Sequence, residues 1–151
     1  MMMIKKTWLL AFVGFLLFVI GNIVITHEDF APTFHSSIAN LATLKTMARD
    51  SVPYQVARTN GKPSLIEFYA DWCQTCQSLA VTLEQLQHKY GESINFTMLN
   101  IDDPQWHQQI QTYQVTGVPH LTFLRANQEV VETLIGKAPE VVIENILKEF
   151  K

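Results

Sequence analysis

Apolar residues recur along the chain with two different periods, and the period changes from one segment to the next. Short, nearly continuous apolar runs are typical of strands covered on both faces, whereas apolar residues three and four positions apart predict amphipathic helices. The segments alternate in a way that predicts an α/β layer fold. The expected strands are residues 64–70, 94–101, 120–125 and 129–135, and the expected helices are residues 74–90, 103–114 and 138–150.

The N-terminal segment is apolar throughout. Trp8 to Ile25 carries no charged residue, and a helix of that length spans about 27 Å, close to the ~30 Å hydrocarbon core of a bilayer. A cleaved signal peptide is the alternative, but its apolar region is shorter and ends in a small-x-small site. We expect a transmembrane anchor at residues 8–25 behind a tail of residues 1–7. Because Lys5 and Lys6 precede the span, the N-terminus should stay cytoplasmic and the rest should cross the membrane.

The region between the anchor and the first strand contains two helical patterns. The spacing of the apolar positions in residues 36–51 predicts a short amphipathic helix with Ser36 or Ser37 as its cap. This helix would lie near the membrane or pack on the domain. Residues 52–63 indicate a short helix that ends at Asn60-Gly61. We expect residues 26–50 to be a linker and residues 51–151 to be the folded domain. The apolar positions of the first helix are Ile38, Leu41, Leu44 and Met47.

The chain has only two cysteines, Cys73 and Cys76. A disulfide that closes so small a loop constrains the unfolded chain little, so a purely structural role has little support. A zinc site needs two more ligands, but there is no second C-x-x-C and the histidines are scattered singly. A C-x-x-C between a strand and a helix in an α/β context is typical of a redox pair. We therefore expect no metal, and no cofactor besides the redox-active disulfide itself.

The spacing of the cysteines suits thiol–disulfide exchange. Cys73 is expected at the N-terminus of the following helix, where unpaired amides and the helix dipole stabilise a thiolate. This thiolate attacks a substrate disulfide and forms a mixed disulfide. Cys76, one helical turn later on the same face, then attacks Cys73 and releases the reduced product. Cys73 is thus the expected nucleophile and Cys76 the resolving thiol.

Glu67 interrupts the apolar run of the first strand, six residues before Cys73. A carboxylate on a strand that is covered on both faces is costly to bury, and its pKa should rise. It can then accept and return the proton of Cys76, directly or through a water. The alternative is a glutamate that faces solvent from an edge strand. The apolar neighbours favour burial, so Glu67 is the third expected catalytic residue.

Composition and charge narrow the classes of function. Of the 151 residues, 48% are hydrophobic and 17% are charged, which is enough for a packed core and argues against disorder. The formal net charge is -3. There is no run of lysine or arginine, so nucleic-acid binding has little support.

D-W-C-x-x-C after a strand, with G-V-P-H before a later one, resembles the thioredoxin family. The resemblance implies a thioredoxin-like fold, with a mixed central sheet and helices on both faces. It also implies a cis Pro119 that faces the cysteines, with Val118 lending its backbone to an extended substrate segment. The residues alone leave an ordinary trans proline open. Trp72 matches the aromatic residue beside the nucleophile. Gly136 matches a glycine of the substrate-facing surface, for which a plain turn glycine is the alternative.

The chain departs from the usual thioredoxin pattern at three places. Gln74 and Thr75 replace the Gly-Pro between the cysteines, so an ordinary thioredoxin reduction potential is not assumed. Glu67 matches the family's buried acid, usually Asp, and Met98 lies where many thioredoxins carry a Lys, so the carboxylate should lack a nearby cation. His120 follows the proline where Thr is common. It either exchanges protons near the site or, as is more frequent for a lone histidine, packs in the core.

Residues 60–80, 98–106 and 117–124, behind one apolar N-terminal segment, look like the TxlA-type membrane thioredoxins of cyanobacteria and chloroplast thylakoids. This resemblance implies a reductant of protein disulfides, c-type apocytochromes among them, on the lumenal or periplasmic side. It implies electrons from a CcdA-like membrane carrier and a role in c-type cytochrome and cytochrome b6f assembly. The alternatives are an oxidant or isomerase, a non-catalytic assembly factor that docks through the thioredoxin face, and a metal carrier.

Overall fold

The computed structural model describes residues 31–150. Residues Ser37–Lys151 cluster into one compact unit. The anchor expected at residues 8–25 and the tail before it lie outside the described residues. Within the described part of the chain, no helix combines the length and the apolar character needed to cross a membrane.

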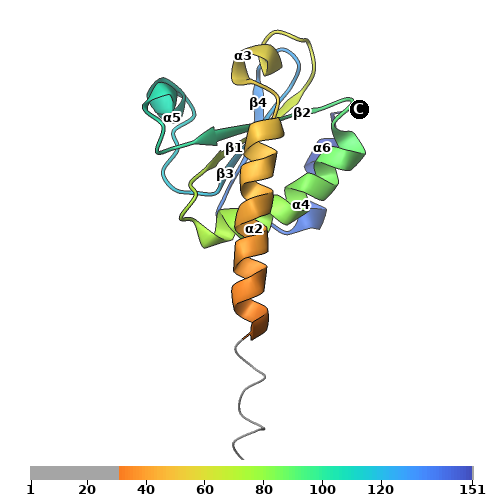
Figure 1. The fold of residues 1–151 in the computed structure, drawn as a ribbon. Helices are drawn as coiled ribbons and strands as arrows, with labels where there is room; N and C mark the ends of the chain where they lie inside the picture. Colours follow the sequence, from red (N-terminus) through yellow and green to blue (C-terminus); the bar gives the residue numbers. More distant parts are fainter. Residues whose placement is uncertain (1–30, 151) are drawn as a thin grey trace, which may run out of the picture. The chain divides into compact units, whose positions relative to one another are not determined.

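Four strands form one mixed sheet in the order β2-β1-β3-β4 (Figure 1). Strand β1 (Ser64–Tyr69) pairs in parallel with β2 (Asn95–Asn100) and antiparallel with β3 (His120–Leu124). Strand β4 (Val130–Ile135) pairs antiparallel with β3, so β2 and β4 are the two edge strands of the sheet. Every residue of β1 and β3 is buried, as their continuous apolar runs predict, because helices cover both faces.

Side chains of a strand alternate between the two faces of the sheet, and each face has its own apolar core. Helices α4 (Gln74–Tyr90) and α6 (Glu140–Lys148) cover the first face. The short helix α3 (Tyr54–Ala57), the 3₁₀ turn η1 (Pro104–Trp106) and helix α5 (His107–Thr112) cover the second. The first core includes Leu65, Tyr69, Phe96, Met98, Leu121 and Phe123 from the strands, and the second includes Ile66, Phe68, Leu99 and Leu124.

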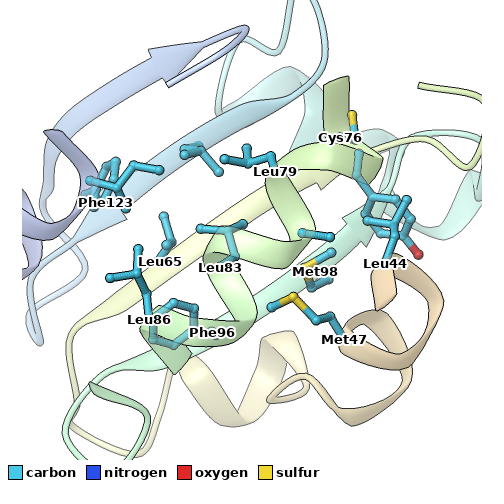
Figure 2. Packing of buried hydrophobic residues seen from close by; sticks show 14 of the residues in the cluster. Leu44, Met47, Leu65, Cys76, Leu79, Leu83, Leu86, Phe96, Met98 and Phe123 are labelled. Atoms are coloured by element: carbon cyan, nitrogen blue, oxygen red, sulfur yellow. The ribbon is translucent and has the colours of Figure 1, made fainter. Parts of the chain in front are cut away.

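Helix α2 (Ala31–Asp50) differs most from the expectation. The sequence indicated a short helix capped by Ser36 or Ser37, but both serines lie inside the helix. Leu44 and Met47 are buried in the first core (Figure 2), where they point towards the sheet and α4. This burial extends the compact unit back to Ser37, whereas the expected domain began at residue 51.

Two further helical segments differ from the expectation. Helix α3 ends at Ala57, before Asn60-Gly61, and the helix expected over 103–114 divides into η1 and α5. Gly91 caps α4 with a right-handed φ of -63°. A left-handed conformation is therefore not what selects glycine there. A Cβ at residue 91 would lie 2.6 Å from the carbonyl oxygen of Gln87, so the glycine permits a close backbone approach.

Because Leu44 is fully buried, Leu44→Ala should lower the free energy of unfolding by about 2–5 kcal/mol through lost burial and a residual cavity. Ile38 lies on the same helix but is 56% exposed, so Ile38→Ala should change stability by no more than about 0.5 kcal/mol. Urea denaturation of the detergent-solubilised full chain measures both values. Equal effects of the two substitutions would show that α2 is not part of the domain core.

Candidate active site

Cys73 and Cys76 are joined by a disulfide at the start of α4. Cys73 is the N-cap residue, as expected, and its Sγ accepts a hydrogen bond from the backbone N–H of Cys76 at 3.1 Å. Cys73 is 6% exposed and Cys76 is fully buried. After reduction, the same N–H and the helix dipole can stabilise a thiolate on Cys73. The more accessible cysteine is therefore also the one whose sulfur receives the backbone N–H of the helix.

The segment between β1 and α4 is held at several points. The backbone N–H of Cys73 donates to the carbonyl of Ala70 at 3.1 Å. The carbonyl of Asp71 accepts from Gln77 Nε2 at 2.7 Å, and Asp71 Oδ2 accepts from Lys45 Nζ of α2 at 2.9 Å. These contacts fix the path of the backbone immediately before the nucleophile.

Glu67 lies in the middle of β1 and is 1% exposed. By the alternation of β1 it shares a face with Leu65 and Tyr69, which belong to the core under α4 together with Cys76. Its register partners are Met98 and Leu121, and neither carboxyl oxygen has a hydrogen-bond partner among the described residues. Burial raises the pKa of Glu67 to about 8. Within residues 31–150, Glu67 is thus buried with no cation bound to its carboxyl group, as the strand pattern and Met98 indicated.

His120 lies on the opposite face of the sheet. Its register partner on β1 is Phe68, whose ring it meets edge-on with centroids 5.6 Å apart. Both ring nitrogens are buried without a partner in the described part of the chain, and burial lowers the pKa of His120. The sheet separates this imidazole from Cys76 and Glu67, which favours the packing interpretation over proton exchange at the site.

The Val118–Pro119 peptide bond is cis, the conformation that the thioredoxin resemblance implied. Pro119 is buried, and its carbonyl accepts a hydrogen bond from the N–H of Gly136 at 2.8 Å. Gly136 has a φ of +83°, and an added Cβ would meet nothing within 4 Å. The left-handed backbone, and not lack of space, therefore selects glycine beside the cis-proline.

Trp72 and Val118 line one groove of about 390 Å³. Trp72 is 65% exposed, and its indole Nε1 donates to Asp102 Oδ2 at 2.9 Å. The sequence pattern did not single out Asp102 or the groove residue Ile101. They directly follow β2, and neighbouring parallel strands end at one edge of the sheet, so their position after the second strand was an available signal. The remaining lining residues are Ile110, Val115, Thr116 and Gly117.

The family model described as thioredoxin matches residues 43–149. The chain therefore belongs to the thioredoxin family. It is 40% identical over 102 residues to the thiol:disulfide interchange protein TxlA homolog of Synechocystis sp., covering 68% of this chain and 57% of that protein. It is 36% identical over 105 residues to the chloroplastic thioredoxin-like protein HCF164 of Arabidopsis thaliana, covering 69% and 40%. The chain thus spans about half the length of these relatives, and the expected TxlA-type resemblance is confirmed.

Solved thioredoxin structures resemble this fold. A mutant thioredoxin from Halobacterium salinarum is 28% identical, with a TM-score of 0.55 over 62% of this chain and 79% of the other. The germline-specific thioredoxin Deadhead from Drosophila melanogaster is 25% identical, also with a TM-score of 0.55, over 64% and 87%. The thioredoxin-like fold expected for the domain is confirmed.

The buried Glu67 should make stability depend on pH. Below pH 4.5 it is protonated in the folded and the unfolded chain alike. Between pH 4.5 and about 8 only the unfolded chain loses this proton, so the native protein loses stability as pH rises, and the loss is complete above that range. Glu67→Gln removes the dependence. The free energy of unfolding of the variant, taken relative to that of the unchanged protein, should therefore rise by up to about 5 kcal/mol from pH 4.5 to pH 8.5.

Urea denaturation of the oxidised protein at the two pH values measures this gain. Glu92 is exposed, so Glu92→Gln is the matched control and should show no comparable gain. A Glu67→Gln variant whose stability relative to the native chain is the same at both pH values would mean that Glu67 ionises normally in the folded state.

Proposed function

We propose that this chain is a membrane-anchored reductant of protein disulfides that works on the lumenal or periplasmic side of its membrane. The observation that carries the proposal is the arrangement of the cysteine pair. The pair begins a helix, a buried carboxyl group lies on the same face of the sheet, and an open apolar groove is lined by the neighbouring Trp72.

In the proposed reaction, the Cys73 thiolate attacks one sulfur of a substrate disulfide. A mixed disulfide forms, and the other substrate sulfur leaves as a thiolate that takes up a proton. Glu67 removes the proton of the Cys76 thiol, directly or through a water. The Cys76 thiolate attacks Cys73 Sγ, which closes the Cys73–Cys76 disulfide and expels the second substrate sulfur, to which the proton returns. Two electrons have then passed to the substrate.

The raised pKa of Glu67 suits its proposed part. A carboxyl group with a pKa of about 8 can both take and return a proton in the range in which thiols titrate. The resolving thiol is fully buried, so a thiolate would form there at high cost without a base on the same side of the sheet. Glu67 is the carboxyl group that the register of β1 places on that face.

The groove is the proposed binding site for an extended substrate segment. Trp72 and Val118 form apolar walls, while the cis Pro119 and Gly136 form a hydrogen-bonded support beside Val118. An extended segment that lies against Val118 can pair with its backbone, a mode in which main-chain hydrogen bonds supply affinity without demanding one sequence. This arrangement fits a reductase that serves several proteins.

The proposed electron donor is a CcdA-like dithiol carrier in the membrane, because each turnover leaves the cysteine pair oxidised. The apolar segment at residues 8–25 and the lysines before it support an anchored domain across the membrane from the N-terminus. The similarity to a TxlA homolog and to a chloroplastic thioredoxin-like protein supports a thylakoid membrane. Reduction of c-type apocytochromes, in the assembly of c-type cytochromes and cytochrome b6f, is the process that we propose it serves.

A Cys76→Ser variant tests the reaction and identifies its substrates. The reduced full-length variant is mixed with oxidised proteins from the lumenal or periplasmic fraction. Because a serine hydroxyl at position 76 cannot resolve the intermediate, Cys73 should remain in mixed disulfides that are visible on non-reducing gels and disappear with dithiothreitol. The matched control is Cys73→Ser, which lacks the nucleophile and should yield few adducts. Equal yields from both variants, or none from either, would contradict reductive exchange through Cys73.

The proposed topology has its own test. The full chain should resist extraction by alkaline carbonate, and its catalytic domain should be digested by protease only from the lumenal or periplasmic side. Lys5→Glu with Lys6→Glu removes the positive bias and should lower the fraction of correctly oriented protein. Release of the unaltered chain by carbonate would exclude the anchor, and digestion from the cytoplasmic side would reverse the proposed orientation.

A further inference from the structure

An ion pair connects helix α2 to the segment of residues 70–73, which ends at the nucleophile Cys73. The sequence did not indicate that α2 is part of the site. Asp71 lies two residues before Cys73, and its carboxylate receives Lys45 Nζ at 2.9 Å. The same residue's carbonyl is held by Gln77 of α4 at 2.7 Å. The backbone of Asp71 is thus held by α4, while the carboxylate of Asp71 is paired with a lysine of α2.

The position of Lys45 on α2 is itself determined by the core. Its neighbour Leu44 is fully buried and Met47 is 3% exposed, both in the cluster that contains Cys73 and Cys76. The lysine therefore projects from a rigidly packed turn of helix, although its own side chain remains largely exposed. Such anchoring reduces the conformational freedom that the ion pair must restrict.

The surroundings of the cysteine pair are acidic. Asp71 precedes the cysteine pair, and Asp102 and Asp103 follow β2, where Asp102 accepts the hydrogen bond of Trp72. The charge of Asp71 acts within this region: burial is the first cause that raises the pKa of Tyr69, and the negative charge of Asp71 is the second. A thiolate on Cys73 adds another negative charge to this region. An unpaired Asp71 would disfavour that thiolate because like charges repel.

We propose that Lys45 is a positioning residue for the exchange reaction, which acts by pairing the charge of Asp71 and so preserving the thiolate of Cys73. The inference rests on the proposed function only in taking Cys73 as the nucleophile. It assigns a role in the chemistry to α2, which otherwise serves as packing for the first face of the sheet.

The experiment measures the rate of Cys73 alkylation by iodoacetamide against pH. All variants are built in the full chain with Cys76→Ser, so that Cys73 is the only thiol. Lys45→Gln should slow alkylation about two- to fivefold below the midpoint of the titration, as expected for a partly exposed ion pair. Asp71→Asn should accelerate it by a similar factor. The double variant should return close to the starting rate, because a neutral pair then replaces the ion pair.

Several controls separate this effect from changes in folding or total charge. Lys45→Arg keeps the cation and should retain the original rate. Arg49→Gln breaks the Arg49–Asp50 ion pair on the same helix and should leave the rate unchanged. The difference between Lys45→Gln and the starting protein should shrink in about 1 M salt, where exposed charges are screened. Far-ultraviolet circular dichroism checks that each variant is folded.

Three results would overturn the proposal. Lys45→Gln could leave the titration unchanged, the double variant could keep the full slowing, or Asp71→Asn could slow alkylation as Lys45→Gln does. The last result would mean that the pair only maintains the shape of the segment. Alkylation needs no protein substrate, so the two proposals can fail separately. If the Cys76→Ser trap captures no substrate while the alkylation rates change as expected, the proposed function is refuted and the role of Lys45 stands.

Discussion

Strand β1 pairs with β2 on one side and with β3 on the other, and this pairing brings together the segments that carry the cysteine pair, Asp102 and the cis-proline. Because β1 and β2 are parallel, their carboxyl ends lie side by side. Asp71–Cys73 follow the end of β1, and Ile101–Asp102 follow the end of β2. Because β3 is antiparallel to β1, the start of β3, with the cis-proline before it, lies beside these carboxyl ends. Three segments that are distant in sequence therefore meet because one buried strand is hydrogen-bonded along both sides.

In the part of the chain that the structure describes, two ionisable groups of this sheet are buried without a hydrogen-bond partner, with opposite consequences for their pKa values. Desolvation disfavours the charged form in each case, so it raises the pKa of Glu67 and lowers the pKa of His120. Both groups therefore stay neutral over much of the neutral pH range. The alternation of side chains places them on opposite faces, and only Glu67 shares the face of Cys76. Position, not the direction of the pKa shift, separates the proposed proton carrier from a packing residue.

Helix α2 joins packing and chemistry within the compact unit. Leu44 and Met47 complete the core beneath α4, on the face that holds the cysteines. The turn of helix that they anchor carries Lys45 to Asp71. A change in the packing of α2 would therefore affect the charge balance next to the nucleophile as well as stability. In this chain, residues that precede the first strand contribute to both properties.

Local patterns in the sequence determined most of the secondary structure and the centre of the site. Apolar runs and helical spacing predicted the strands and the main helices, and the isolated C-x-x-C between a strand and a helix predicted a redox pair, because these signals depend on neighbouring residues only. Burial of Glu67 was predictable for the same reason, since its apolar neighbours lie on both sides in sequence. Tertiary structure decided the extent of α2, the face occupied by His120 and the pairing of Lys45 with Asp71. It also decided the place of Ile101 in the groove and the hydrogen bond of Asp102 to Trp72. Each depends on strand register or on contacts between residues far apart in sequence, which no local pattern records.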